Sequence, residues 1–308
     1  MTARLPEPPA SDADVPRWAA QLGLPGLVDI HVHFLPEPVQ RKVWAYFDNA
    51  EANYGRPWPI HYRYDEPTRV TILRDLAVRH YAPLVYAHKP GMAEWLNSWV
   101  LDFAERVPEA VPTATLYPEP EVTRYVGAAL EAGARCVKVH VQVGGFDPTD
   151  PQLDRAWAMI AEAAVPVVVH CGHGPIRGAH TGLDVFEQVL NANPGLVTVL
   201  AHAGMPDYSE AAKLALRYPN VYLDTTMVGT AFTEVFAPIP PDWAELLVTL
   251  GDRIVFGTDF SQIPHEYAEQ ARVVHRWAAS DERLGVEFLR RVLYTTPARL
   301  LGVSDQGQ

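Results

Sequence analysis

The stretch VPVVVHCGHGPIRGAHTGLDVFEQVLNANPGLVTVLAH, residues 165–202, holds two short apolar runs on either side of a helical segment. The runs, 165–170 and 196–202, are rich in valine and end in His170 and His202. Short β-branched runs bounded by Gly, Pro or Asn are typical of buried parallel strands. The segment between them closes on Asn-Pro-Gly, which is a helix stop signal. The stretch therefore predicts a strand, a helix and a second strand.

The same alternation extends in both directions along the chain. Further apolar runs predict strands at 27–33, 82–87, 111–117, 135–141, 220–226 and 253–259. Helical segments with start or stop residues lie at 119–133, 147–164, 182–195 and 240–252. About eight alternations in a chain of 308 residues predict an α/β fold, a single (β/α)8 barrel of the TIM type. An open doubly wound sheet is the rival, but no GxGxxG turn follows the first strand.

Two segments fall outside the alternation. Residues 1–25 are rich in Pro, Ala and Asp and predict a loose N-terminal arm, followed by a barrel over 26–308. Residues 35–65 follow the first strand as an insertion with seven aromatic residues among several prolines. So many aromatic side chains argue against disorder. We expect the insertion to be either a packed subdomain that plugs one end of the barrel or a substrate lid.

Composition and charge exclude several classes of protein. A net charge of −12 without a basic stripe disfavours nucleic-acid binding. No stretch approaches the roughly 20 apolar residues that a membrane span requires, and the first residues lack the pattern of a secretory signal. The only two cysteines, Cys136 and Cys171, fit a reducing compartment, so we expect a cytoplasmic protein.

Strand parity predicts which side chains of the first strand point into the barrel. Residues two apart in a strand point to the same face. Asp29, His31 and His33 therefore share one face of 27–33, and the apolar residues at the even positions share the other. A barrel strand needs an apolar face toward its helices, so we expect the Asp/His face to point inward.

Three other predicted strands end in ligand-type residues by the same arithmetic. In 165–170 the valines at odd positions face outward, and His170 faces inward as the last residue. In 196–202 Val197, Val199 and Ala201 face outward, which leaves His202 inward. In 253–259 the inward residue at the end is Asp259. Catalytic barrels place their working residues at these strand ends.

The strand ends together predict one divalent metal ion, with these ligands: His31, His33, His170 and Asp259. Three imidazoles and a carboxylate suit Zn²⁺, our default, with Mn²⁺, Fe²⁺ or Co²⁺ as alternatives. Taken alone, each residue is more often structural, since a strand-terminal Asp usually caps a turn. Their coincidence at four strand ends favours the metal site. We expect Asp259 and His202 to be catalytic and to move protons beside a metal-activated water.

Four motifs, in this order, resemble the amidohydrolase-related family: DIHVHF (29–34), VVVHCGHGP (167–175), VLAHAGMP (199–206) and VFGTDF (255–260). The resemblance covers roughly residues 26–302. It implies a metal-dependent hydrolase, or a decarboxylase similar to aminocarboxymuconate-semialdehyde decarboxylase. It also implies that the first His pair, His170 and Asp259 are ligands. His202 matches the family's histidine after the sixth strand, which is commonly catalytic or in contact with the ligands.

Lys138 has several interpretations. Lys138 and His140 share the inward face of 135–141. Some relatives carry a carboxylated lysine on the fourth strand that bridges two metals. We prefer a buried lysine paired with Asp29 or Asp259, because buried charges need partners, and we therefore predict one metal. Lys138 is also a candidate, with His140, for binding a substrate carboxylate.

The segment 171–182 follows the fifth predicted strand and is rich in glycine. Such loops hold anionic substrate groups through backbone N–H and guanidinium contacts, so His173 and Arg177 are candidates for substrate binding. The alternative is a flexible solvent loop whose charged groups only keep it soluble.

The leading functional hypothesis is a metal-dependent hydrolase in which activated water attacks a small amide, lactone or ester. The alternative is a non-oxidative decarboxylase of an aromatic or unsaturated carboxylic acid that uses the same metal cage. A catalytically silent metal-binding barrel is a third interpretation. The expected partner is a small-molecule substrate, with no nucleic acid and no membrane. Exposed aromatic residues favour a homodimer, which no segment of the sequence establishes.

Overall fold

The apolar runs of the sequence form eight short strands in the computed structural model, which describes residues 4–303. The strands are β1 (Leu27–Val32), β2 (Val78–Pro83), β3 (Thr113–Thr115), β4 (Cys136–His140), β5 (Val167–His170), β6 (Thr198–Leu200), β7 (Val221–Asp224) and β8 (Ile254–Val255). Every pairing between neighbouring strands is parallel. Strands β3 to β8 form one sheet in chain order, and β1 pairs with β2.

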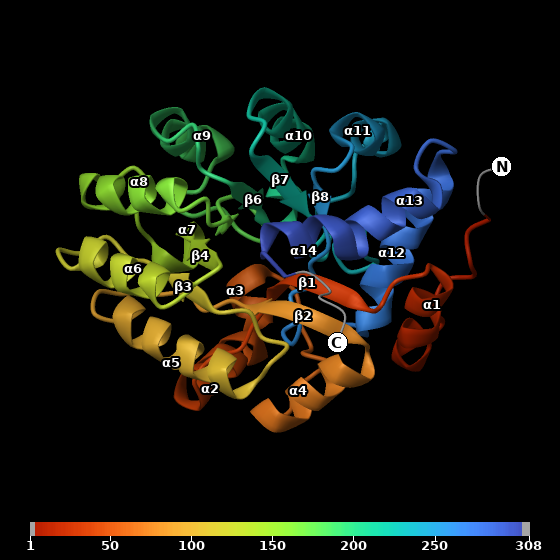
Figure 1. Cartoon of the computed structure of the whole chain (residues 1–308), viewed down its shortest axis with the longest axis horizontal. Helices are drawn as coiled ribbons and strands as arrows, with labels where there is room; N and C mark the ends of the chain where they lie inside the picture. The colour runs from red at the N-terminus through yellow and green to blue at the C-terminus, as the bar shows by residue number, and fades with distance from the viewer. Residues whose placement is uncertain (1–3, 304–308) are drawn as a thin grey trace.

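Hydrogen bonds rather than regular ladders join these two sheets. Between β1 and β8, the Ile30 amide donates to the Phe256 carbonyl at 3.0 Å. Between β2 and β3, the Val111 amide donates to the Tyr81 carbonyl at 2.8 Å. The strands therefore form a ring, which confirms the predicted TIM-type barrel (Figure 1).

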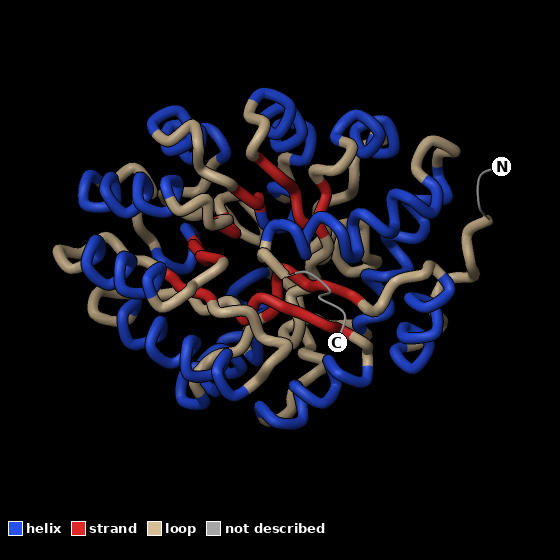
Figure 2. Tube along the Cα trace, in the orientation of Figure 1, coloured by secondary structure: helices blue, strands red, loops and turns tan. Residues whose placement is uncertain are grey.

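Helices surround the ring of strands, as Figure 2 shows in blue and red. They are α1 (Val15–Gln21), α2 (Glu37–Asp48), α3 (Ala50–Tyr54), α4 (Glu66–Asp75), α5 (Ala93–Arg106), α6 (Val122–Glu131), α7 (Val141–Gly144), α8 (Asp154–Glu162), α9 (Leu183–Ala192), α10 (Tyr208–Arg217), α11 (Trp243–Leu250), α12 (Tyr267–Ser280), α13 (Gly285–Arg290) and α14 (Thr296–Leu300). Helices α6, α8, α9 and α11 confirm the four predicted helical segments. None of the helices within 4–303 has the length and hydrophobicity to cross a membrane.

Buried apolar residues form two layers. The outer layer lies between the strands and the helices and includes Val167 and Val169 of β5. The inner cluster, here called the floor, has residues in or next to every strand, among them Ile30, Val168 and Val255. Ala298 of α14 belongs to the floor, and α14 contacts β1 and β8. Figure 1 shows α14 crossing the centre of the ring, so this helix closes one end of the barrel.

The side-chain directions predicted from strand parity were wrong for part of β1. Val28 and Ile30, predicted to face the helices, belong to the floor. Asp29, predicted to point inward, accepts a hydrogen bond of 2.9 Å from the Tyr267 hydroxyl of α12. The register with β2 is irregular between Asp29 and Val32. A bulge of this kind adds a residue and reverses the later side chains, which returns His31 to the interior.

Parity was also wrong for β6, although its terminal histidine does reach the interior. Val199 and Ala201 lie in the floor, whereas Leu200 packs in the outer layer. The strand ends at Leu200, and His202 follows with a φ of 55°. The left-handed backbone turn, rather than strand alternation, therefore carries the His202 ring inward.

Strand β2 begins four residues earlier than predicted. The sequence predicts a strand over 82–87, whereas β2 spans Val78–Pro83. Arg79 is exposed and His80 is partly exposed, so polar side chains interrupt the apolar pattern at the start of the strand. The apolar residues after Pro83 continue as a loop.

The N-terminal segment is not loose throughout, so that expectation was wrong for residues 12–22. Helix α1 buries Val15 and Trp18. Asp12 accepts hydrogen bonds from the Tyr62 hydroxyl of the insertion and, at 2.8 Å, from the Ala268 amide of α12. The N-terminal segment thus packs on both the barrel and the insertion.

Candidate active site

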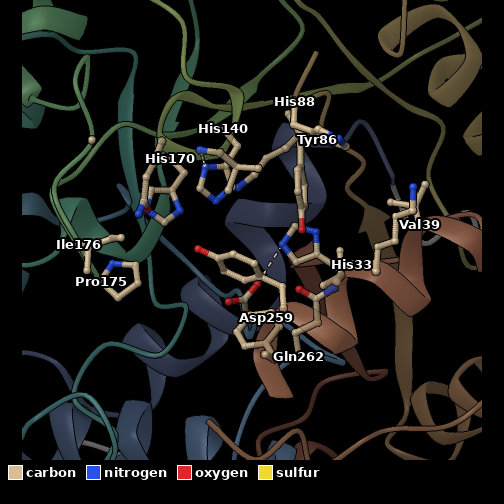
Figure 3. A pocket seen from close by; sticks show the side chains of 18 of the residues that line it. His33, Val39, Tyr86, His88, His140, His170, Pro175, Ile176, Asp259 and Gln262 are labelled. Carbon is tan, nitrogen blue, oxygen red and sulfur yellow. Dashed lines mark hydrogen bonds and ion pairs between the residues drawn. The ribbon is translucent and has the colours of Figure 1, made fainter. Parts of the chain in front are cut away.

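Three of the predicted ligands converge where β1 and β8 end. One ligand atom each from His31, His33 and Asp259 lies within 4.8 Å of the others. The His33 Nε2 is 2.9 Å from the Asp259 Oδ1, and the His31 Nε2 is 3.7 Å from the same oxygen. Figure 3 shows His33 facing Asp259 across this short gap. The donors are close enough to hold one ion between them.

The remaining nitrogen of each histidine ring has a protein partner. The His31 Nδ1 lies 2.8 Å from Asp224 Oδ2, and the His33 Nδ1 lies 2.9 Å from the Leu84 carbonyl. Because a carbonyl only accepts, the His33 Nδ1 carries a proton, which leaves Nε2 as the nitrogen that faces Asp259. Burial, and then the charge of Lys138, lower the pKa of His31, which favours the neutral form of this ring. Such partners orient metal-binding imidazoles.

Asp224 was missed as a site residue by the sequence analysis. It ends β7 and is buried. Its Oδ2 faces His31, and its Oδ1 accepts from the amides of His202 at 2.7 Å and Thr226 at 3.1 Å. The carboxylate therefore links two candidate site histidines. The strand-end rule would have found it, since the predicted strand 220–226 includes this aspartate.

His170 lies beside the three-residue group rather than within it. Its Nε2 is 2.8 Å from the Gly174 carbonyl, which leaves Nδ1 as the acceptor nitrogen. Its ring stacks on His140, with centroids 4.1 Å apart, and lies 4.8 Å from the ring of His202. Figure 3 shows His170 and His140 together on one side of the cavity. Its assignment as a fourth ligand stays a prediction.

His202 is placed to exchange a proton. Its Nδ1 is 3.1 Å from the Thr226 carbonyl, so the proton is on Nδ1 and Nε2 has the lone pair. Burial lowers the pKa of the ring. Its centroid lies 5.3 Å from that of His31. A neutral imidazole beside the ligand group can act as a general base.

Lys138 is fully buried, but its predicted pairing with a carboxylate was wrong. The Nζ lies 3.0 Å from the His31 Nε2, and Asp29 is bound by Tyr267 instead. No acid lies within ion-pair distance of Lys138 in the part of the chain that the structure describes. Burial lowers the pKa of the amine to about 8. Lys138 is therefore a buried donor directed at the nitrogen that a metal would use.

A cavity of about 790 Å³ opens above these groups. The insertion forms part of its wall with Val39, Phe47, Tyr54 and Trp58, and the Trp58 indole donates to the Gln262 carbonyl at 2.9 Å. A cavity of this size accommodates a drug-sized organic molecule. The insertion thus takes part in the site.

The predicted substrate-binding residues divide into two groups. Lys138, His140 and Arg177 line the cavity. His173 is not among the described residues that line it, and its Nδ1 lies 2.6 Å from Asp207 Oδ2. The role of His173 in substrate binding stays a prediction. Tyr86, which the sequence analysis missed, lies between His33 and His140, 5.3 Å from each ring.

A family model described as amidohydrolase matches residues 28–303. No curated protein sequence matches the chain. Similar solved structures include an amidohydrolase from Burkholderia multivorans with bound zinc, 16% identical with a TM-score of 0.61, covering 91% of this chain and 100% of that one.

Two further structures have names that describe a reaction. One is 5-carboxyvanillate decarboxylase from Sphingomonas paucimobilis, 14% identical with a TM-score of 0.62, covering 91% of this chain and 99% of that one. The other is a probable 2-pyrone-4,6-dicarboxylic acid hydrolase from Acinetobacter baumannii, 14% identical with a TM-score of 0.56, covering 90% and 99%. At such low sequence identities, these structural matches show a shared fold alone. Because the family model spans nearly all of the barrel, this chain belongs to the amidohydrolase family.

Proposed function

We propose that this protein is a metal-dependent hydrolase that cleaves an amide, ester or lactone bond in a substrate bound in the cavity. The observation that carries the proposal is the group formed by the buried His31 and His33 with the partly exposed Asp259, in which both histidine Nδ1 atoms face acceptors. A neutral His202 lies beside it. The three side chains offer nitrogen and oxygen donors to an ion, and His202 offers a base next to it.

The donor set fits a first-row divalent ion. His31, His33 and Asp259 would hold it, with His170 as the proposed fourth ligand. Imidazole and carboxylate donors suit Zn²⁺, and Mn²⁺, Fe²⁺ and Co²⁺ accept the same donors. When bound, such an ion polarises a carbonyl oxygen and makes a water more acidic.

Residues of the chain supply the proton transfers. Burial alone would raise the pKa of Asp259, but its close contacts with His33 and then His31 outweigh burial and lower the pKa. Asp259 is thus ionised and can accept a proton from the attacking water. His202 Nε2 can accept that proton or deliver one to the leaving group. The apolar wall from the insertion limits access of bulk water.

Decarboxylation of an aromatic or unsaturated acid is the second candidate. Its support is the pair of cations, Lys138 and Arg177, that line the same cavity and suit a substrate carboxylate. The name of the Sphingomonas structure also describes a decarboxylase. Product analysis separates the candidates, because decarboxylation releases carbon dioxide without breaking an acyl bond.

The first test measures metal content by plasma mass spectrometry. The variants are His31→Ala/His33→Ala and Asp259→Ala, with His275→Ala as the matched histidine control, since His275 lies on α12 and contacts Trp18. We expect about one ion per wild-type chain, retention in the control and loss in the double variant. Aryl esters, lactones, anilides and aromatic acids are then assayed with that ion.

Each result bears on a different part of the proposal. Absence of metal after reconstitution would refute the mechanism. Two tightly bound ions per chain would refute the prediction of a single metal. Metal binding without turnover of any compound class would favour the catalytically silent barrel.

A further inference from the structure

Lysine is rare in this chain, and three of its four lysines line one cavity. The 25 basic residues comprise 21 arginines and only Lys42, Lys89, Lys138 and Lys213. The first three line the cavity above the candidate metal group. Lys213 lies on α10 and pairs with Glu210 at 3.4 Å. Lys138 is buried, whereas Lys42 and Lys89 are exposed and are here called the mouth lysines.

The mouth lysines have no acidic partner within residues 4–303, although acids outnumber bases by 37 to 25 in the whole chain. The neighbouring arginine on α2, Arg41, is paired with Glu37, so an acid is available close in sequence. Asp259 is the only acidic side chain among the described residues that line the cavity. Unpaired positive charge in a hollow of an acidic protein attracts anions.

The mouth lysines belong to one cluster, although they come from different segments. Lys42 is on α2, and Lys89 is in the loop after β2. Partial burial lowers the pKa of His88, and the charges of Lys89 and then Lys42 lower it further. Both ammonium groups therefore act on the same imidazole, which also lines the cavity. Two positive charges from separate elements thus converge on one part of the rim.

Apolar side chains cover much of the rest of the rim. Seven large apolar side chains are exposed in the described part of the chain. Four of them line this cavity: Tyr46, Trp95, Val143 and Ile176. Concentration of exposed apolar surface around a cavity marks a binding site for an apolar group. A ligand that satisfies both features has an apolar body and an anionic group.

We propose that Lys42 and Lys89 form a subsite for an anionic group, a carboxylate or a phosphate, at the end of an amphipathic substrate distant from the bond that reacts. The apolar body lies against the rim and the aromatic wall, and the reacting end reaches the group of His31, His33 and Asp259. The position of the reacting end rests on the proposed function. The preference for a distal anion does not require turnover and is tested separately.

The first experiment measures binding with a pair of ligands that differ in charge. The ligands are the anion of ω-phenylhexanoic acid, the neutral amide of that acid, and ω-phenylhexyl phosphate. Their binding is followed by the change in tryptophan fluorescence, since Trp58 and Trp95 line the cavity. We expect the wild type to bind the carboxylate about fivefold to tenfold more tightly than the amide, which is the effect of two exposed charges. The phosphate arm shows which anion the subsite prefers.

Matched variants assign the preference to the mouth lysines. Lys42→Gln/Lys89→Gln is expected to reduce the preference to about twofold or less. Lys42→Arg/Lys89→Arg, which keeps the charge, is expected to retain it, as is the control Lys213→Gln. Circular dichroism checks that each variant folds. An unchanged preference in the double glutamine variant, or no preference in the wild type, would overturn the proposal.

A kinetic experiment separates this proposal from the proposed function. Phenyl hexanoate and monophenyl adipate share the scissile ester and differ by a terminal carboxylate. If both are hydrolysed, kcat/KM for the adipate should fall about fivefold to tenfold in the double glutamine variant, with the hexanoate unchanged. Hydrolysis with no difference between the esters would refute the subsite alone. A lysine-dependent binding preference without hydrolysis of either ester would refute ester hydrolysis and leave the subsite standing.

Discussion

The two ends of the barrel interior use neighbouring residues of the same strands for opposite purposes. The floor is apolar, with Ile30 and Val168 packed against α14 and its neighbours. One or two residues later, the same strands present His31 and His170 to the cavity at the other end of the barrel, here called the mouth. The floor is held mainly by apolar contact, whereas the mouth depends on a network of hydrogen bonds. Stability and chemistry are thus separated along each strand by a few ångströms.

The largest expected effect comes from opening the floor. Ile30→Ala removes a fully buried side chain, and the cavity that remains should cost about 2–5 kcal/mol of unfolding free energy. Metal content per folded chain should stay at the wild-type value, because the donor group is untouched. Urea unfolding and metal analysis on the same sample measure both quantities. Loss of metal in the folded variant would show that the two ends are not separable.

Asp224→Asn tests the mouth with almost no change in volume. Asp224 uses both oxygens as acceptors, one for His31 and the other for two backbone amides. An amide has only one oxygen, so its NH₂ group would face His31 and move the ring proton to Nε2. Metal affinity should fall about 10–100-fold. Competition with a chelator measures it, and unchanged affinity would show that the carboxylate does not select the His31 tautomer.

The smallest expected effect on stability comes from an ion pair on the outer surface, away from the floor and the mouth. Arg155 and Glu162 form an exposed pair on α8, 3.0 Å apart. Arg155→Ala should change the unfolding free energy by no more than about 0.5 kcal/mol, because solvent screens exposed pairs. Metal content should stay the same. A larger change in the urea midpoint would mean that the outer surface contributes to stability on a scale closer to that of the floor.

The sequence predicts the barrel well because strand and helix signals are local. Valine-rich runs and helix stop residues locate seven strands closely, and β2 is misplaced only because Arg79 and His80 break its apolar pattern. Parity succeeds where the ladder is regular, as in β5. It fails in β1 and β6, where a bulge and the left-handed His202 change the direction of the side chains. Those features depend on tertiary contacts.

The site is predictable to the extent that it depends on strand ends. The structure brings His31, His33 and Asp259 together, as expected for residues at the ends of neighbouring strands. The partner of Lys138 could not be predicted, because the bulge turns Asp29 away from the interior. The mouth lysines lie on a helix and a loop with no shared pattern in the sequence. Only the folded chain brings them to one cavity.

The irregularity of β1 has a consequence for protein design. The Asp29 Oδ1 accepts the His31 amide at 3.0 Å, a local hydrogen bond that holds the extra residue in place. A designer who copied only His-x-His onto a regular strand with the floor facing inward would aim both rings at the surrounding helices. The transferable unit is therefore longer than the two ligands. It includes the aspartate that precedes them and the Tyr267 hydroxyl that binds that aspartate from the next layer.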